Sequence, residues 1–318
     1  MLTLALITTD VMDSLKGRDL LSLADLSSTE LHGLLELAAE LKAGTKQPTC
    51  PNKVLGLVFS KASTRTRVSF SVAMYQLGGQ VLDLNAGVTQ VGRGEPTADT
   101  ARVLDRYLDV VAIRTFAQTE IEEFAQYASI PVINALTDLE HPCQILADLL
   151  TLKEAFGTLD NLTMSYLGDG NNVAHSLMLG CALAGVNIRV GTPEEFLPDP
   201  AVVNKAVQIS QGRSEVIITT DPKAAVQGSH ALYTDVWASM GDESEAESRI
   251  PKFQPYQINQ ALLDLADEQA IILHCLPAHR GEEITHEVME GPHSRLWDQA
   301  ENRLHAQKAL LAAILNAT

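Results

Sequence analysis

The stretch Ser63-Thr64-Arg65-Thr66-Arg67 stands between an apolar run, Val54–Phe59, and a segment without proline or glycine at residues 68–77. This order predicts a strand that passes through a short polar turn into a helix, and Gly78-Gly79 is a strong signal for the end of that helix. A helix N-terminus offers unpaired N–H groups and the positive end of the helix dipole. Because hydroxyls and arginines are added there, we expect the turn to bind a small, multiply charged anion such as phosphate.

A solvated, basic first turn is the alternative interpretation of the same stretch. Cations stabilise a helix at its C-terminus, and two arginines near the N-terminus oppose the dipole unless an anion joins them. We therefore favour the anion site.

Strand-like and helix-like segments alternate along almost the whole chain, which favours parallel sheets with helices on both faces. The expected strands are residues 54–59, 81–84, 110–113 and 131–134 in a first series, and 162–167, 187–190, 216–219, 231–235 and 271–275 in a second. A chain of 318 residues has room for two such domains. The predicted fold class is α/β, with two domains, each a mostly parallel, Rossmann-like sheet flanked by helices, joined by interdomain helices.

The predicted joint between the domains is the helix Pro142–Phe156, which begins with proline and is followed by Gly157. The expected organisation is an N-terminal extension at 1–16, a first domain at 17–149, a second at 150–295 and a C-terminal helix within 296–318. Met12 offers an alternative start, and a frayed native tail explains the extension equally well. Residues 240–254 are acidic and without periodicity, which predicts a mobile loop.

Composition limits the possible partners. The formal net charge of −17 argues against nucleic acid or an anionic membrane as a partner, and it requires an anionic substrate to be captured by a local positive focus. No apolar run approaches the roughly 18 residues needed to cross a bilayer, and the N-terminus lacks the features of a signal peptide. The four cysteines, which have no CxxC spacing, are typical of reduced thiols in a cytoplasm: Cys50, Cys143, Cys181 and Cys275.

Three further motifs follow the first in order along the chain. They are His141-Pro142-Cys143-Gln144, Asp235-Val236-Trp237-Ala238-Ser239-Met240-Gly241 and His274-Cys275-Leu276-Pro277. Residues 63–67 resemble the carbamoyl-phosphate motif of the aspartate and ornithine transcarbamylases, and the three later motifs resemble the ornithine branch of that family. The resemblance covers nearly everything from about Gly17 to the C-terminus.

The resemblance implies a reaction and an assembly. Carbamoyl phosphate would bind to the first domain, and its carbamoyl group would pass to the δ-amine of L-ornithine, giving L-citrulline and phosphate for arginine biosynthesis. No metal or organic cofactor is implied. The family is usually built on trimers, so a homo-oligomer is expected, and its last helix returns to the first domain.

Two positions in the carbamoyl-phosphate set have a physical reason to be there. Arg114 ends a predicted strand, and ligands of α/β sheets gather at the carboxyl ends of strands, although a surface arginine is the alternative. His141 and Gln144 lie three residues apart at a helix N-terminus, which favours a neutral imidazole that can polarise a carbonyl oxygen. By resemblance, the residues that bind carbamoyl phosphate are Ser63, Thr64, Arg65, Thr66, Gln90 from a neighbouring subunit, Arg114, His141, Gln144, Cys275, Leu276 and Arg303.

The acceptor residues come from the second half of the chain. An aspartate suits an ammonium group, while an amide and a backbone N–H suit a carboxylate. By resemblance, the ornithine-binding residues are Asn172, Asp235, Ser239 and Met240, and the catalytic residues are Arg114, His141, Asp235 and Cys275. Taken alone, Asn172 and Asp235 also fit ordinary loop roles. Cys275 lies near the attacking amine in the family, where the Leu276 carbonyl receives the carbamoyl NH₂, and Leu276–Pro277 is a candidate cis bond.

Several alternatives remain beside this interpretation. The turn Gly168-Asp169-Gly170 lacks the third glycine of a dinucleotide fingerprint, because Val173 stands there. The pairs His141/Cys143 and His274/Cys275 lack zinc-site spacing. Aspartate is disfavoured as the acceptor, because residues 62–152 contain no lysine and the aspartate branch carries one there. N-acetylornithine or putrescine as the acceptor, and a catalytically silent binding subunit, stay open.

Overall fold

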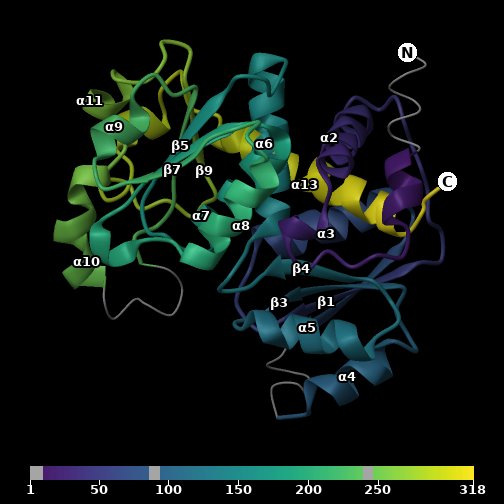
Figure 1. Cartoon of the computed structure of the whole chain (residues 1–318). Helices are drawn as coiled ribbons and strands as arrows, with labels where there is room; N and C mark the ends of the chain where they lie inside the picture. The colour runs from purple at the N-terminus through teal and green to yellow at the C-terminus, as the bar shows by residue number, and fades with distance from the viewer. Residues whose placement is uncertain (1–9, 86–93, 239–245) are drawn as a thin grey trace. The chain divides into compact units, whose positions relative to one another are not determined.

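The structure, a computed structural model, describes residues 10–85, 94–238 and 246–318, and it divides into two compact units (Figure 1). The first unit comprises residues up to Leu150 together with Asn302–Thr318, and the second comprises Thr151–Glu301. Both boundaries fall inside continuous helices, α6 (Pro142–Phe156) and α13 (Leu296–Ile314). The predicted fold class is confirmed, because each unit contains a parallel sheet with helices around it.

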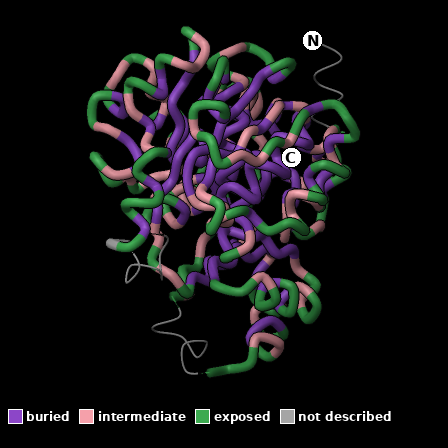
Figure 2. The backbone as a smooth tube through the Cα atoms, turned by 60° about the vertical axis from the view of Figure 1, so that its left-hand side comes forward, coloured by how far each residue is buried: buried purple, intermediate pink, exposed green. Residues whose placement is uncertain are grey.

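The first unit is built on four parallel strands in the order β2-β1-β3-β4. They are β1 (Val54–Phe59), β2 (Gln80–Asn85), β3 (Val110–Arg114) and β4 (Val132–Leu136). Strands β1, β3 and β4 are almost wholly buried, whereas β2 forms a largely exposed edge. Figure 2 shows buried backbone in the interior and exposed backbone mainly in the outer segments. The helices of this unit are α2 (Ser28–Lys42), α3 (Arg65–Gln76), α4 (Thr97–Leu104) and α5 (Gln118–Tyr127), besides parts of α6 and α13.

The N-terminal part of the first unit is ordered by local signals and by packing. Helix α2 begins after Ser27, which forms a capping box with Glu30, a pattern of a serine followed three residues later by a glutamate. Residues 10–15 are helical, and Val11 and Leu15 are buried. Val11 lies so close to Gly33 of α2 that a Cβ there would clash with it. The described part of the predicted extension is therefore packed rather than frayed.

The second unit contains five parallel strands in the order β7-β6-β5-β8-β9. They are β5 (Thr163–Leu167), β6 (Asn187–Gly191), β7 (Val216–Thr219), β8 (Ala231–Thr234) and β9 (Ile271–His274). Helices α7 (Asn172–Ala184), α8 (Pro200–Ser210), α9 (Pro222–Val226), α10 (Ala246–Phe253), α11 (Gln260–Leu263) and α12 (His286–Met289) complete it with parts of α6 and α13. Strands β5, β8 and β9 are fully buried.

The predicted loop at 240–254 is wrong for residues 246–253, which form α10. The helix is held by tertiary contacts that a local pattern does not reveal. Phe253 is fully buried and packs its ring against those of Phe196 and Trp237, while Arg249 pairs with Asp169. These contacts outweigh the presence of Pro251 inside the helix.

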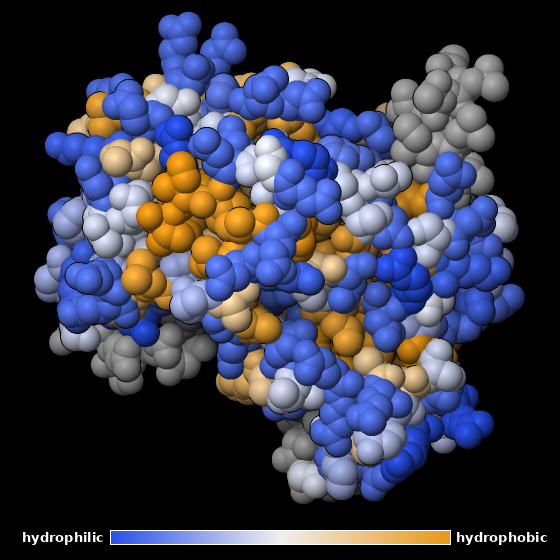
Figure 3. All heavy atoms as spheres, in the orientation of Figure 1, coloured by the Kyte–Doolittle hydropathy of each residue, from blue (hydrophilic) through white to orange (hydrophobic). Residues whose placement is uncertain are grey.

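Within the described ranges, no helix combines the length and the apolar character that crossing a membrane requires. The face shown in Figure 3 is hydrophilic around most of its periphery, with hydrophobic residues gathered over the middle of the second unit.

Candidate functional site

The stretch at 63–67, which the sequence predicts to bind an anion, lies where two neighbouring strands end. The strands β1 and β3 are paired so that Phe59 stands opposite Arg114, and the Ser60 amide donates to the Arg114 carbonyl at 2.8 Å. The turn at 63–66 and Arg114 therefore leave the sheet at the same edge, at the point where the strand order reverses between β1 and β3. Arg114 is buried, so it is not a surface arginine.

A hydrogen-bonded chain links three of the predicted residues to one another. Arg303 donates through Nη1 to Oε1 of Gln144 at 2.5 Å and through Nη2 to Oγ1 of Thr66 at 3.0 Å. All three side chains are almost completely buried. The structure thus brings together residues that are separated by more than two hundred positions in the sequence.

His141 lies among positive charges. Burial and then the guanidinium groups of Arg303, Arg114 and Arg65 hold the pKa of His141 well below its usual value of 6.5. The imidazole is therefore neutral at neutral pH, as the sequence predicts, and a neutral imidazole can donate a hydrogen bond to a carbonyl oxygen. Three cationic side chains around one neutral donor form an environment suited to a dianionic ligand.

The two arginines of the opening stretch have different surroundings. Helix α3 begins at Arg65, and Thr64 at its N-cap makes no side-chain hydrogen bond to the helix. Arg67, by contrast, pairs with Asp83 on β2 and lies over the ring of Phe59. The expectation that an anion joins both arginines is therefore wrong for Arg67, whose charge is balanced within the chain.

Asp235 is the centre of the corresponding edge of the second unit. The strand register pairs Leu167 with Thr234 and Thr234 with His274, so the segments that follow β5, β8 and β9 emerge side by side. Asp235 accepts hydrogen bonds from the Cys275 thiol at 2.9 Å, the Val236 amide at 2.8 Å and the Asn171 amide group at 3.1 Å. The Cys275 thiol thus serves as a donor to a carboxylate.

Asn171, whose role no sequence motif indicated, supports this carboxylate directly. It caps α7 by accepting from the amides of Val173 and Ala174, and it accepts weakly from the Tyr166 hydroxyl at 3.4 Å. The predicted residue Asn172 is its neighbour, the first residue of α7 and partly exposed. The capping pattern before α7 was the available signal for Asn171.

The loop that carries Cys275 and Leu276 is held by a buried histidine. His274 accepts from the Leu276 amide at Nδ1 (2.8 Å), so its Nε2 carries the proton and donates to Glu283 at 3.0 Å. The Leu276–Pro277 peptide bond is cis, as expected, and Leu276 has a φ of 58°. In the described residues, ligand atoms of Asp235, His274 and Cys275 lie close enough to suit a metal ion, but these contacts already engage them.

Arg249 is a second residue that no sequence motif indicated. It donates to Asp169 at 2.7 Å and to the Trp237 carbonyl at 3.1 Å, so it ties the turn after β5 to the segment after β8. Burial, and after it the charges of Asp235 and Asp169, raise the pKa of Tyr166 well above its usual value. The carboxylates of Asp235 and Asp169 therefore both lie near the Tyr166 hydroxyl, and Arg249 balances the charge of Asp169.

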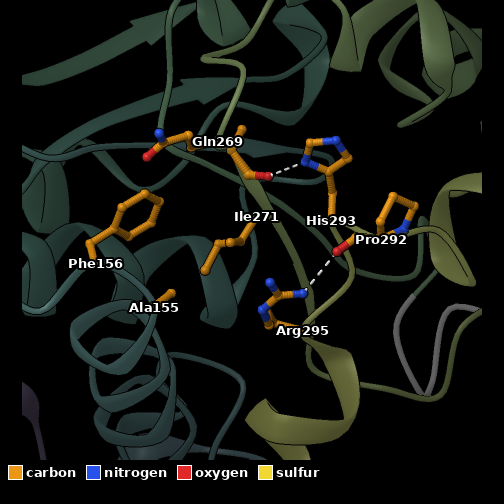
Figure 4. A pocket seen from close by; sticks show the side chains of 8 residues that line it. Ala155, Phe156, Gln269, Ile271, Pro292, His293 and Arg295 are labelled. Carbon is orange, nitrogen blue, oxygen red and sulfur yellow. Dashed lines mark hydrogen bonds between the residues drawn. The ribbon is translucent and has the colours of Figure 1, made fainter.

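A pocket of about 330 Å³ opens at the other end of β9 and contains none of the predicted residues (Figure 4). Figure 4 shows His293 bonded to the carbonyl of Ala270 at 2.6 Å and Arg295 bonded to that of Pro292 at 3.0 Å. The side chains of His293 and Arg295 thus form hydrogen bonds with backbone carbonyl groups of the same unit. Gln90, Ser239 and Met240, which the sequence analysis includes in the site, lie outside the described residues.

Two family models together span nearly all of the chain. Residues 18–154 match the carbamoyl-phosphate-binding domain of the aspartate/ornithine carbamoyltransferases, and residues 160–314 match their aspartate/ornithine-binding domain. The chain belongs to the aspartate/ornithine carbamoyltransferase family. The resemblance that the four motifs indicated is thereby confirmed.

Individual members of the carbamoyltransferase family are similar over almost their whole length. A protein named ornithine carbamoyltransferase from Thermosynechococcus vestitus is 70% identical over 305 residues, covering 96% of this chain and 98% of its own. One from Nostoc punctiforme is 68% identical, covering 96% and 100%. Among solved structures, ornithine carbamoyltransferase from Gloeobacter violaceus has a TM-score of 0.86 at 62% identity (93% and 98% covered), and that from Pyrococcus furiosus 0.92 at 48% (96% and 99%).

The remaining cysteines of this family member are enclosed. Burial raises the pKa of Cys143 to about 12, and its thiol donates to the Asn134 carbonyl. Cys50 and Cys181 are also buried and free, whereas Cys275 is partly exposed. Such burial is typical of inert structural thiols.

The depressed pKa of His141 predicts a pH-dependent stability. Below about pH 6.5 the unfolded chain takes up a proton on this side chain that the folded protein excludes, so stability should fall with pH by at most about 1.4 kcal/mol per pH unit. His141→Asn should reduce this slope between about pH 7.5 and about pH 5.5 in urea unfolding. His279→Asn, at an exposed histidine, is the control for replacing an imidazole by an amide. An unaltered slope in His141→Asn would contradict the assignment.

Proposed function

We propose that this protein is an enzyme that transfers the carbamoyl group of carbamoyl phosphate to the δ-amine of L-ornithine, giving L-citrulline and phosphate in arginine biosynthesis. The observation that carries the proposal is the convergence of three guanidinium groups on a neutral, buried His141 in the domain that matches the carbamoyl-phosphate model. Relatives of 66–70% identity named ornithine carbamoyltransferase support ornithine as the acceptor. The proposed domain limits are 17–149 and 150–295.

The first unit would bind and polarise carbamoyl phosphate. The turn at 63–66 and the guanidinium groups of Arg65, Arg114 and Arg303 would hold the phosphate, with Gln90 contributed by a neighbouring subunit. His141 and Arg114 would donate to the carbamoyl oxygen, while Gln144 would accept from the carbamoyl NH₂. These donors are fixed before the reaction, so they can stabilise the developing oxyanion without reorganisation.

The second unit would hold the acceptor. Asp235 suits the α-ammonium of ornithine, and Asn172, Ser239 and Met240 would hold its carboxylate end. Cys275 and the Leu276 carbonyl would lie beside the reacting groups. The neutral δ-amine attacks the carbamoyl carbon, a C–N bond forms, the C–O bond to phosphate breaks, and the departing phosphate accepts the amine proton. Most of the acceleration would come from positioning and electrostatics.

The decisive experiment is a colorimetric assay for the ureido product with carbamoyl phosphate and one amine at a time. Ornithine should give product, because Asp235 can bind its α-ammonium while its neutral δ-amine attacks the carbamoyl carbon. N-acetylornithine, putrescine and aspartate should give little. Product with another amine alone would refute the acceptor, and no product with any of the four would favour a catalytically silent binding subunit.

Replacing Asp235 by asparagine tests the acceptor half of the proposal. The change removes the charge that faces the ammonium, so kcat/KM for ornithine should fall roughly 10- to 100-fold while the affinity for carbamoyl phosphate is kept. Asp221→Asn is a matched control in the same unit, because Asp221 caps α9. Ornithine kinetics equal to those of the unmodified enzyme would show that the acceptor is placed wrongly.

We also propose that the protein acts in the cytoplasm as a homotrimer or an assembly of trimers. The exposed apolar surface of α3 and the neighbouring edge strand β2 supports an interface there, since Tyr75, Val68 and Leu82 are 79%, 54% and 48% exposed. Analytical ultracentrifugation should show trimers or larger species, and Tyr75→Glu should shift them toward monomers with a loss of activity. A fully active monomer would refute the shared site.

A further inference from the structure

Asp148 is a completely buried acid one helical turn beyond Gln144 on α6, and no motif of the sequence singled it out. The Nε2 group of Gln144 donates to its Oδ1 at 2.8 Å. Residues four apart on a helix share one face, so the two side chains are neighbours by construction. A buried carboxylate needs hydrogen-bond donors, and the Gln144 amide is one of them.

The contacts of Gln144 settle which end of its amide faces which neighbour. A carboxylate accepts hydrogen bonds, so the atom that faces Asp148 must be the amide nitrogen. A guanidinium only donates, so the atom that faces Arg303 must be the carbonyl oxygen Oε1. The two neighbours independently require the same orientation, in which Asp148 holds the nitrogen end and leaves the oxygen end toward the arginine.

This orientation has a consequence for the ligand. A carbonyl oxygen has two lone pairs, and the contact with Arg303 uses one of them. The second can accept from an N–H group beside Arg303 and Thr66. A flipped amide would present its NH₂ group in that place. This donor would then face two other donors, the Arg303 guanidinium and the NH₂ of a carbamoyl group.

We propose that Asp148 is a positioning residue that locks the Gln144 amide with its oxygen toward the carbamoyl NH₂, so that the site prefers carbamoyl phosphate to acyl phosphates without an N–H. The inference rests on the proposed function, because it takes carbamoyl phosphate as the ligand. Its probe is acetyl phosphate, which has the same phosphate and carbonyl groups but a methyl group in place of NH₂.

The test compares equilibrium binding of carbamoyl phosphate and acetyl phosphate, at low temperature and without an acceptor. Asparagine at 148 can either donate or accept, so Asp148→Asn removes one of the two constraints on the Gln144 amide. Only Arg303 then favours the original orientation, and the flipped orientation becomes accessible. Affinity for carbamoyl phosphate should fall roughly 10- to 100-fold, while affinity for acetyl phosphate changes by less than about two-fold. Equal losses for both ligands, or no loss for either, would overturn the proposal.

A double-mutant cycle separates positioning from general packing. In a Gln144→Ala background, Asp148→Asn should change the affinity for carbamoyl phosphate little further, because the Gln144 amide through which Asp148 acts is absent. A full loss in that background would show that Asp148 acts by another route. Asp148→Ser, which also donates or accepts, replaces Asp148→Asn if that variant does not fold by circular dichroism, and the same selective loss is expected.

A matched control comes from a second buried acid of the same unit. Glu140 accepts from the Leu23 amide and the Ser22 hydroxyl, and neither of these residues belongs to the proposed site. Glu140→Gln should lower thermal stability but leave the preference between the two ligands unchanged. If the unmodified protein binds neither ligand, the proposed function fails; if it discriminates and Asp148→Asn discriminates equally well, only the role of Asp148 fails.

Discussion

Repulsion between like charges at a largely buried histidine is the constraint on which the first unit depends. Three guanidinium groups act on His141, and the chain around them has a net charge of −17. Arg114 and Arg303 are buried, where the low dielectric strengthens the repulsion between cations, whereas Arg65 is exposed. A dianionic ligand would convert that repulsion into attraction. The same field keeps His141 neutral. Binding and the electrostatic part of catalysis would therefore have a common origin.

The second unit presents the opposite sign at the equivalent edge of its own sheet. Asp235 is surrounded by donors from the ends of β5, β8 and β9, and Arg249 compensates the neighbouring Asp169. One carboxylate is thus left without a cation of its own among these contacts, which suits an acceptor with an ammonium group. Because parallel strands expose all their carboxyl ends at one edge, each unit can assemble its residues from distant parts of the sequence.

Features that depend on neighbours in the sequence were predictable. The strands, the start of α3 beyond residues 63–64 and the capping box at Ser27 follow from local patterns, and the four motifs gave the family. Features that depend on tertiary contacts were not. Helix α10 exists because Phe253 and Arg249 are buried. The roles of Asn171 and Asp148 depend on their hydrogen bonds to Asp235 and Gln144, respectively. Gln90, Ser239 and Met240 remain predictions.

The first unit is not a continuous piece of chain, because residues 302–318 belong with residues up to Leu150. Arg303 lies in that returning segment and bonds to Thr66 and Gln144. Residue 303 follows the whole second unit in the chain, so these two hydrogen bonds cannot form until the second unit has been synthesised. An isolated N-terminal fragment therefore cannot complete the buried contacts between Thr66, Gln144 and Arg303.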